Sequence, residues 1–202
     1  FARSTAAALE SFAIGDNNTI ESGANQSFTF GQSNLIKGIA GNKYMNGALG
    51  RYNEINGVVD YAFGSYNIIS HPNNVIVIQE DGGNMAVGLY NTIKASGQSF
   101  ASGKENIIYS KGSSAFGYKN TTGLSTNLDA ALFSFAQGEG NSTTNTSEAV
   151  LGRFNLPVAG AIFQVGDGNS SSSQSNIIST IKGNVPADSW MAIGSGTNIP
   201  SK

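Results

Sequence analysis

The chain has 202 residues, of which 39% are hydrophobic, only 12% are charged and 26 are glycine. This charge content is low for an ordinary soluble surface, and the glycine spacing is too regular for a disordered linker. The 11 basic and 13 acidic residues give a net charge of −2 without a basic run, which argues against nucleic acid as a partner.

No apolar run approaches the roughly 20 residues that cross a bilayer, and no signal-peptide pattern is visible, so we expect no membrane insertion. Cysteine is absent, which is compatible with an exported protein and with many others. Because the chain begins at Phe1 without a methionine, we expect a fragment or a processed product.

Three zones follow one another along the chain. Residues 1–10 are a lead-in segment, whose short alanine run fits either a helical turn or a strand. Residues 11–147 are predicted as a β-roll repeat region with irregular insertions near 71–84 and 121–134. Residues 148–202 are predicted as a C-terminal region with degenerate repeats, where the four serines from Ser170 to Ser173 indicate an exposed loop.

The repeat is Gly-x-x-Asn, usually with a small residue two positions before the glycine. Its ten copies are Gly15/Asn18, Gly31/Asn34, Gly50/Asn53, Gly64/Asn67, Gly88/Asn91, Gly103/Asn106, Gly117/Asn120, Gly138/Asn141, Gly152/Asn155 and Gly166/Asn169. Successive glycines are 16, 19, 14, 24, 15, 14, 21, 14 and 14 residues apart, and 28 more residues lead to Gly194. A 14-residue unit accommodates two short strands and two turns. The fold class predicted is therefore all-β, a parallel β-roll or β-helix solenoid.

The residues before each glycine predict a strand with two non-polar faces. Alanine recurs two positions before the glycine, as in Ala13, Ala62 and Ala115, and a bulky residue directly before it, as in Ile14 and Phe30. These positions lie on opposite faces of a strand. One face must line the coil, where we place alanine, and the other must be covered. Isoleucine two positions after the asparagine predicts a second strand, at Ile20, Ile36, Ile55, Ile69, Ile93 and Ile108.

The repeated glycine and asparagine have separate physical roles. Glycine permits a positive φ or a close backbone approach, and asparagine tolerates the left-handed conformation and bonds to its own turn. Stacked asparagines can also form an amide ladder. We favour this structural interpretation over a ligand-binding asparagine row.

Catalytic and metal-binding signals are weak, so we predict a non-enzyme without cofactor or metal. His71, the only histidine, is interpreted as a loop residue. The oxygen-rich segments Asp81-Gly82-Gly83-Asn84 and Asp167-Gly168-Asn169 are interpreted as turns rather than calcium loops. Val75–Ile78 is predicted as a strand, and its 24-residue interval is compatible with a coil that lost its glycine. The remaining candidates are scattered acids that could pair between chains as in a glycosidase, namely Glu80, Asp81, Glu105 and Glu139.

Aromatic residues give the sharper candidate site. Tyr52, Tyr66, Tyr90 and Phe154 each lie two residues after a repeat glycine, and Tyr118 lies one residue after its own. Stacked at coil spacing, they predict an aromatic stripe suited to sugar rings. The alternative, which we favour, is that the stripe packs between chains or over the coil end.

The motif Ser-x-Ala-x-Gly at 11–15, 99–103, 113–117 and 134–138 resembles the head repeat of trimeric autotransporter adhesins. This resemblance implies a left-handed parallel β-roll with three chains around one axis. The same style of repeat, with Leu-Gly-Arg-Phe-Asn at 151–155 and Phe-Gln-Val-Gly-Asp-Gly at 163–168, is also similar to phage tail-fibre and tailspike proteins.

Together these features predict a homotrimeric shaft or head of a phage tail fibre, located on the virion, that binds a host-surface glycan or protein receptor. One alternative is the head of a bacterial trimeric adhesin at the cell surface. Another is a glycan-degrading tailspike enzyme. An ice-binding solenoid is disfavoured because regular Thr-x-Thr rows are missing.

Overall fold

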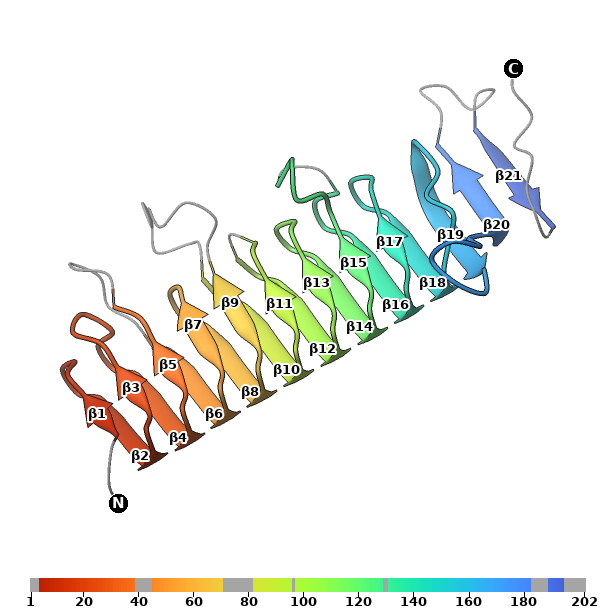
Figure 1. Cartoon of the computed structure of the whole chain (residues 1–202). Coiled ribbons are helices and arrows are strands. Elements are labelled where there is room, and N and C mark those ends of the chain that lie inside the picture. The colour runs from red at the N-terminus through yellow and green to blue at the C-terminus, as the bar shows by residue number, and fades with distance from the viewer. Residues whose placement is uncertain are drawn as a thin grey trace. The chain divides into compact units, whose positions relative to one another are not determined.

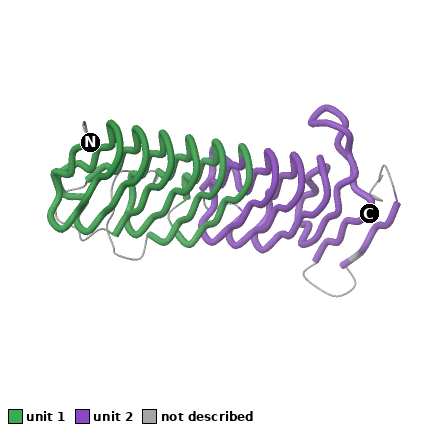
Figure 2. Tube along the Cα trace, turned by 90° about the horizontal axis from the view of Figure 1, so that it is seen from below, with its two compact units in different colours: residues 1–105 green, residues 106–202 purple. Residues whose placement is uncertain are grey.

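The computed structural model describes residues 4–38, 45–70, 82–95, 97–128, 131–182 and 189–194, with the side chain of Trp190 left out. These residues are all-β and contain no helix, and their strands stack as a parallel β-solenoid (Figure 1). The chain divides into two compact units, an N-terminal unit of residues 1–105 and a C-terminal unit of residues 106–202 (Figure 2). The all-β solenoid predicted from the repeat is confirmed.

Each coil of the N-terminal unit contributes one long and one short strand to two parallel sheets. The long strands are β2 (Phe12–Asp16), β4 (Phe28–Gln32), β6 (Gly47–Arg51), β8 (Tyr61–Ser65), β10 (Met85–Leu89) and β12 (Phe100–Lys104). The short strands are β1 (Thr5–Ala6), β3 (Thr19–Ile20), β5 (Leu35–Ile36), β7 (Glu54–Asn56), β9 (Ile68–Ser70) and β11 (Thr92–Ile93). The lead-in segment thus contains a strand rather than a helical turn.

The C-terminal unit begins with the same arrangement. Its long strands are β14 (Ser114–Tyr118), β16 (Phe135–Glu139), β18 (Ala149–Arg153) and β19 (Ala161–Asp167), and its short strands are β13 (Ile107–Ile108), β15 (Thr121–Thr122) and β17 (Ser142–Thr143). The final strands are β20 (Asn176–Ile181) and β21 (Trp190–Ile193).

Within the parallel coils of both units, each strand pairs with its equivalent one coil away without a register shift. Ala48 pairs with Ala62, and Gly50 with Gly64. The second residue of each long strand from β4 to β18 is buried, and Ala48, Ala62, Ala86 and Ala101 are 0% exposed, whereas Ile14 is 55% exposed. The predicted orientation, with alanine inside the coil and the bulky residue outside, is therefore correct. The predicted second-strand isoleucines, Ile20, Ile36, Ile55, Ile69, Ile93 and Ile108, are also buried inside the coil.

The extra residues of the irregular intervals share one place in the order of the strands. β8 pairs directly with β10, and β9 with β11, so the 24-residue interval adds no extra coil. β14 likewise pairs directly with β16 across the longer interval of the C-terminal unit. Each insertion therefore lies between a short strand and the next long strand. Val75–Ile78, predicted as a strand, lies outside the described residues.

The regular coils end at β19. This strand pairs in parallel with β18, but β20 and β21 then pair antiparallel to their neighbours. In the tenth copy of the repeat only the glycine behaves like its equivalents. Gly166 pairs with Gly152, but Asn169 is exposed instead of buried in the coil. Gly194 follows antiparallel β21, and no atom lies within 4 Å of an added Cβ, so this glycine does not make the close backbone approach of the repeat glycines.

Candidate ligand-binding site

The Gly-x-x-Asn corner is built from a close backbone approach that only glycine allows. Gly64 has a φ of 115°, and an added Cβ would lie 2.1 Å from the carbonyl oxygen of Gly88 on the next coil. In the C-terminal unit a Cβ on Gly138, whose φ is 121°, would lie 1.8 Å from the carbonyl oxygen of Gly152. Both atoms belong to backbone, which cannot move aside without disturbing the strand pairing.

The repeat asparagines form a buried amide ladder in each unit. Asn53 Oδ1 accepts hydrogen bonds from the backbone nitrogen of Asn67 at 3.1 Å and from Asn67 Nδ2 at 3.0 Å. Asn67 Nδ2 also lies 3.1 Å from the carbonyl oxygen of Phe63 and 3.0 Å from that of Gly88. Each amide therefore bonds to its own turn and to the coils on either side of it, as its spacing predicts.

Nine of the ten repeat asparagines are buried in this way, with exposed fractions of 0% or 1%. They are Asn18, Asn34, Asn53, Asn67 and Asn91 in the N-terminal unit, and Asn106, Asn120, Asn141 and Asn155 in the C-terminal unit. In all of them except Asn155, Nδ2 donates to the carbonyl oxygen of the repeat glycine one coil further on. Because a ligand cannot reach these side chains, the alternative of a ligand-binding asparagine row is wrong.

The last amide of the ladder differs from the others. Asn155 Nδ2 donates to the carbonyl oxygen of Ser142 at 2.9 Å and to Gln164 Oε1 at 3.3 Å, while its backbone nitrogen still donates to Asn141 Oδ1 at 3.2 Å. At Asn155 the ladder of asparagine amides therefore ends, and hydrogen bonds to Ser142 and Gln164 replace the bond to the next repeat glycine.

The left-handed conformation that we predicted at the asparagine lies one residue earlier. The residue directly before each of the nine buried asparagines has a positive φ. These residues are Asn17, Ser33, Tyr52, Tyr66, Tyr90, Glu105, Lys119, Gly140 and Phe154. None of the nine asparagines has a positive φ itself. That part of the prediction is therefore wrong. The physical reason is that the asparagine amide must point into the coil to reach the next turn, so the reversal of the chain is made by the outward residue before it.

A second buried polar row, which the sequence reasoning missed, precedes the long strands. In the N-terminal unit each backbone N–H donates to the side-chain oxygen one coil earlier: Asn46 to Ser27 at 3.2 Å, Asp60 to Asn46 at 2.8 Å and Asn84 to Asp60 at 2.9 Å. Ser99 N–H continues the row to Asn84 at 3.1 Å. The sequence signal for this row was the serine of the Ser-x-Ala-x-Gly motif, such as Ser99. Asparagine and aspartate at the same position obscured it, because only a short oxygen acceptor is required.

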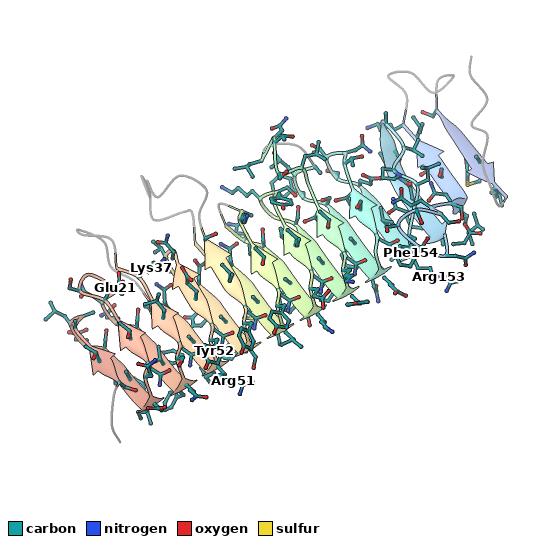
Figure 3. All side chains as sticks on the ribbon, viewed as in Figure 1. Glu21, Lys37, Arg51, Tyr52, Arg153 and Phe154 are labelled. Carbon is teal, nitrogen blue, oxygen red and sulfur yellow. The ribbon has the colours of Figure 1, made fainter. Side chains whose placement is uncertain are left out.

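Tyr52, Tyr66 and Tyr90 form a continuous stack at the outer corner of the N-terminal unit. The ring centroids of Tyr52 and Tyr66 are 4.9 Å apart, and those of Tyr66 and Tyr90 are 4.8 Å apart, with interplanar angles of 17° and 25°. Tyr52 and Tyr90 are 43% and 47% exposed. The guanidinium carbon of Arg51 lies 5.6 Å from the Tyr52 centroid and 5.9 Å from that of Tyr66. Figure 3 labels Arg51 and Tyr52 at the end of β6. The structure thus brings together the three tyrosines of the predicted stripe that belong to this unit.

The C-terminal unit does not repeat this stack. Its residues at the stacking position are Lys119, Gly140 and Phe154, and a Cβ on Gly140 would lie 2.4 Å from the Phe154 ring, which therefore fills that space. Tyr118 occupies the preceding position, the one held by Arg51 in the other unit, and contacts Lys119 with 4.9 Å between the ammonium nitrogen and the ring centroid.

The structure adds little support for the candidate catalytic and metal-binding residues. His71, Glu80 and Asp81 lie outside the described residues. Glu105 is paired with Lys104 at 3.3 Å. In the part of the chain that the structure describes, no group of three or more histidines or acidic residues could hold a metal ion. Glu139 lies in β16 of the C-terminal unit.

The oxygen-rich segment that ends β19 is tied into protein contacts. Asp167 accepts a hydrogen bond from Ser175, and Asn169 Oδ1 accepts one from Arg153 at 3.2 Å. In the other such segment, the amide of Asn84 belongs to the buried row described above. These oxygen atoms are therefore used in turns and ladders.

A buried acid closes the last coils of the C-terminal unit. Glu148 is 1% exposed, and its Oε2 accepts hydrogen bonds from the backbone nitrogens of Thr144 at 2.7 Å and Asn145 at 2.9 Å. Its Oε1 accepts one from Gln164, a buried residue that replaces the lumen alanine. Gln164 Oε1 in turn accepts a hydrogen bond from Asn176 at 2.8 Å. Burial raises the pKa of the Glu148 carboxyl, and the bonds from Thr144, Asn145 and Gln164 oppose that rise.

No protein-family model matches this chain, and no curated protein or solved structure is significantly similar to it. Among the residues described, no helix is long and apolar enough to cross a membrane. The function must therefore be argued from the solenoid and its surfaces.

Proposed function

We propose that this chain is a structural and adhesive part of a phage tail fibre, assembled as a homotrimer on the virion, and that it contacts glycans on the host surface. The observation that carries the proposal is the outer face of the long-strand sheet in the N-terminal unit. The side chains at the first and third positions of these strands point outward, and none of them is charged: Phe12, Ile14, Phe28, Phe30, Leu49, Tyr61, Phe63, Met85, Val87, Phe100 and Ser102, while Gly47 has no side chain and lies under the rings of Phe28 and Tyr61.

Much of this face is aromatic and open to solvent in the single chain. Phe12 is 48% exposed and Phe30 is 37% exposed. The rings contact one another along the sheet, with centroids of Phe12 and Phe28 5.9 Å apart and those of Phe28 and Tyr61 6.5 Å apart. A soluble monomer rarely leaves so large an apolar patch uncovered, and parallel sheets are normally covered on both faces. Further copies of the same chain, related by a closed symmetry, would cover it.

The number of copies and the fibre assignment rest on the resemblance of the repeat to trimeric adhesin heads and tail fibres. The tyrosine stack supports the adhesive role, because it combines aromatic surface with hydroxyl groups at an exposed corner. We propose binding of the glycan without turnover. Release of new reducing ends from host polysaccharide would contradict this and favour the tailspike enzyme.

The assembly is tested by analytical ultracentrifugation at micromolar concentration, where we expect a trimer. Phe30→Glu places a charge on the outer face and should dissociate it. Thr92→Glu is the matched control, because Thr92 is an outward residue of short strand β11, away from that sheet. A monodisperse wild-type monomer, or a trimer unaffected by Phe30→Glu, would contradict the proposed interface.

The adhesive role is tested with the double variant Tyr66→Ala and Tyr90→Ala. We expect it to weaken attachment to host cells or their purified surface polysaccharide while the trimer stays intact. Dissociation of the trimer would instead assign the stack to the interface between chains. Unchanged attachment together with unchanged assembly would contradict both roles.

The bacterial trimeric adhesin remains the second candidate, because the Ser-x-Ala-x-Gly motif that resembles adhesin heads coincides with the buried rows of this coil. Both candidates bind surfaces, and they differ in where the protein is carried. Immunogold labelling with an antibody against the chain separates them. Label on phage tails supports the tail fibre, and label on the producing cell's surface supports the adhesin.

A further inference from the structure

The corner that carries the tyrosine stack holds two parallel rows of side chains. Gln32, Arg51 and Ser65 occupy the same position of three successive long strands and are paired in register. Tyr52 and Tyr66 follow Arg51 and Ser65 directly in the sequence, so the aromatic row runs beside the polar one. Both rows advance by about 4.8 Å per coil, the spacing of adjacent strands.

The backbone does not require tyrosine at this corner. Tyr52, Tyr66 and Tyr90 have φ values of 56°, 56° and 57°, a left-handed conformation that costs about 1–2 kcal/mol for most residues other than glycine. The first coils place Asn17 and Ser33 there. Packing does not require tyrosine either, since two of the rings are more than 40% exposed. A strained, exposed and aligned set of aromatic residues points to a role at the surface.

Arg51 adds a positive charge to this surface. The ion pairs that the structure gives for its described residues, Lys37 with Glu54 and Lys104 with Glu105, do not include Arg51. Its neighbours in the polar row, Gln32 and Ser65, are uncharged. The guanidinium group lies against the rings of Tyr52 and Tyr66, which hold it beside the stack. Guanidinium binds carboxylate and sulfate groups through paired hydrogen bonds.

The C-terminal unit supplies an internal comparison. Arg153 and Phe154 occupy the same positions of the repeat as Arg51 and Tyr52. Arg153 Nη2 donates to Asn169 Oδ1 at 3.2 Å, however, and the Phe154 ring is packed over Gly140. Figure 3 labels both pairs. The same arginine and aromatic pair is therefore engaged within its own unit there and presented at a surface stack only in the N-terminal unit.

We propose that Arg51 and the stack of Tyr52, Tyr66 and Tyr90 bind an acidic glycan. The carboxylate or sulfate of one sugar pairs with Arg51, and the neighbouring sugars lie along the tyrosine row, where the hydroxyls and ring edges contact them. A sugar unit is similar in length to the rise between coils, so a linear chain can place successive units on successive coils. This inference names the ligand class for the proposed adhesive function and depends on that function.

The test is a glycan array that carries uronic-acid, sialylated and sulfated glycans, their neutral counterparts and a single-stranded oligonucleotide. The intact chain should bind the acidic glycans, and binding should weaken as sodium chloride is added. Arg51→Gln should lower the affinity for the best acidic glycan about tenfold or more, since it removes a charge-assisted hydrogen bond. Arg153→Gln is the matched control and should leave affinity unchanged. Melting temperature and oligomeric state should be the same for all three proteins.

Failure of the acidic-glycan inference can be told apart from failure of the proposed adhesive function. Equal binding of acidic and neutral glycans, or an Arg51→Gln variant that binds like wild type, would overturn the acidic ligand and leave the adhesive function standing. Preferential capture of the oligonucleotide would assign another class of ligand and overturn it as well. Binding to no glycan on the array would contradict both proposals.

Discussion

The inside of the coil is filled by isoleucine in the N-terminal unit, whereas in the C-terminal unit it becomes polar. Ile20, Ile36, Ile55, Ile69 and Ile93 are all 0% exposed. The equivalent positions of the C-terminal unit hold Ile108, Thr122 and Thr143, which are buried to the same extent. The strand pairing and the Gly-x-x-Asn corner are nevertheless the same in both units.

The polar lumen is held together by a chain of hydroxyl groups. Thr143 Oγ1 lies 2.8 Å from Ser134 Oγ, which lies 3.3 Å from Ser113 Oγ, and Ser110 Oγ lies 2.9 Å from Ser113 Oγ. Thr122 Oγ1, by contrast, is buried without a hydrogen-bond partner. The comparison indicates that the backbone corner defines the coil. The lumen must only be filled, since it tolerates the unpaired hydroxyl of Thr122.

If the corner defines the coil, its glycine must be equally critical in both units. Gly64→Ala and Gly138→Ala should each destabilise their own unit by roughly 4 kcal/mol, because an unfavourable φ and a clash with backbone add together. Hydrogen exchange measured by mass spectrometry reports the two units separately. Gly160→Ala is the control for conformation alone, since its φ is 74° but the nearest atom to a Cβ is 3.7 Å away. Similar effects of Gly138→Ala and Gly160→Ala would refute the close-approach argument.

The aliphatic lumen can be converted toward the polar one at a single position. Ile69→Thr should destabilise the N-terminal unit by about 3 kcal/mol, because it removes packing and buries a hydroxyl without the serine partners present in the other unit. Ile69→Val should cost only about 1 kcal/mol, because it removes packing but buries no hydroxyl. Valine is the control because it has nearly the same shape as threonine. Chemical unfolding of both variants measures the difference. Equal stabilities would mean that the lumen of this unit accepts an isolated hydroxyl.

Much of the fold could be predicted from the sequence because its constraints recur at fixed spacing. The glycine needed at the close approach and the alanine needed inside the coil appear in coil after coil, so Gly64 and Ala62 could be placed without a structure. The end of the solenoid could not. Gly166 and Asn169 preserve the spacing, but β20 turns back antiparallel to β19, a long-range pairing that no local motif encodes.

The candidate site was predictable in part. Tyr52, Tyr66 and Tyr90 could be placed in one row because the repeat fixes their position, and the stacking follows from the coil spacing. Arg51 was missed, since a single arginine one position earlier carries no periodic signal. The buried polar row that includes Asp60 was also missed, because an acidic residue in a sequence suggests an exposed position until its partners are known.

One unpaired hydroxyl of the C-terminal unit, that of Thr122, gives a smaller effect of opposite sign. Thr122→Val should stabilise this unit by about 1 kcal/mol, because it removes a buried hydroxyl that has no partner and keeps the shape. Thr143→Val should destabilise it by about 1 kcal/mol, because it breaks the bond to Ser134. Thermal unfolding compares the two variants. A loss of stability in Thr122→Val would imply that its hydroxyl is paired.

The smallest effect concerns the acid that closes the polar lumen. The pKa of Glu148 is raised by burial, so the folded state holds this proton more tightly than the unfolded chain does. Its contribution to stability is therefore fully present below the pKa of an unfolded glutamate, near 4.5, and is lost as the pH rises through the raised value. Glu148→Gln removes this titration and leaves an amide facing Gln164.

We therefore expect the stability advantage of the wild type over Glu148→Gln to be greatest in acid and to shrink as the pH increases. Hydrogen exchange in the C-terminal unit across that pH range measures the difference. The N-terminal unit of the same two proteins is the internal control and should show no difference at any pH. An advantage that grows with pH would mean that the bonds from Thr144, Asn145 and Gln164 outweigh burial, and that Glu148 closes the coil as a stabilised carboxylate.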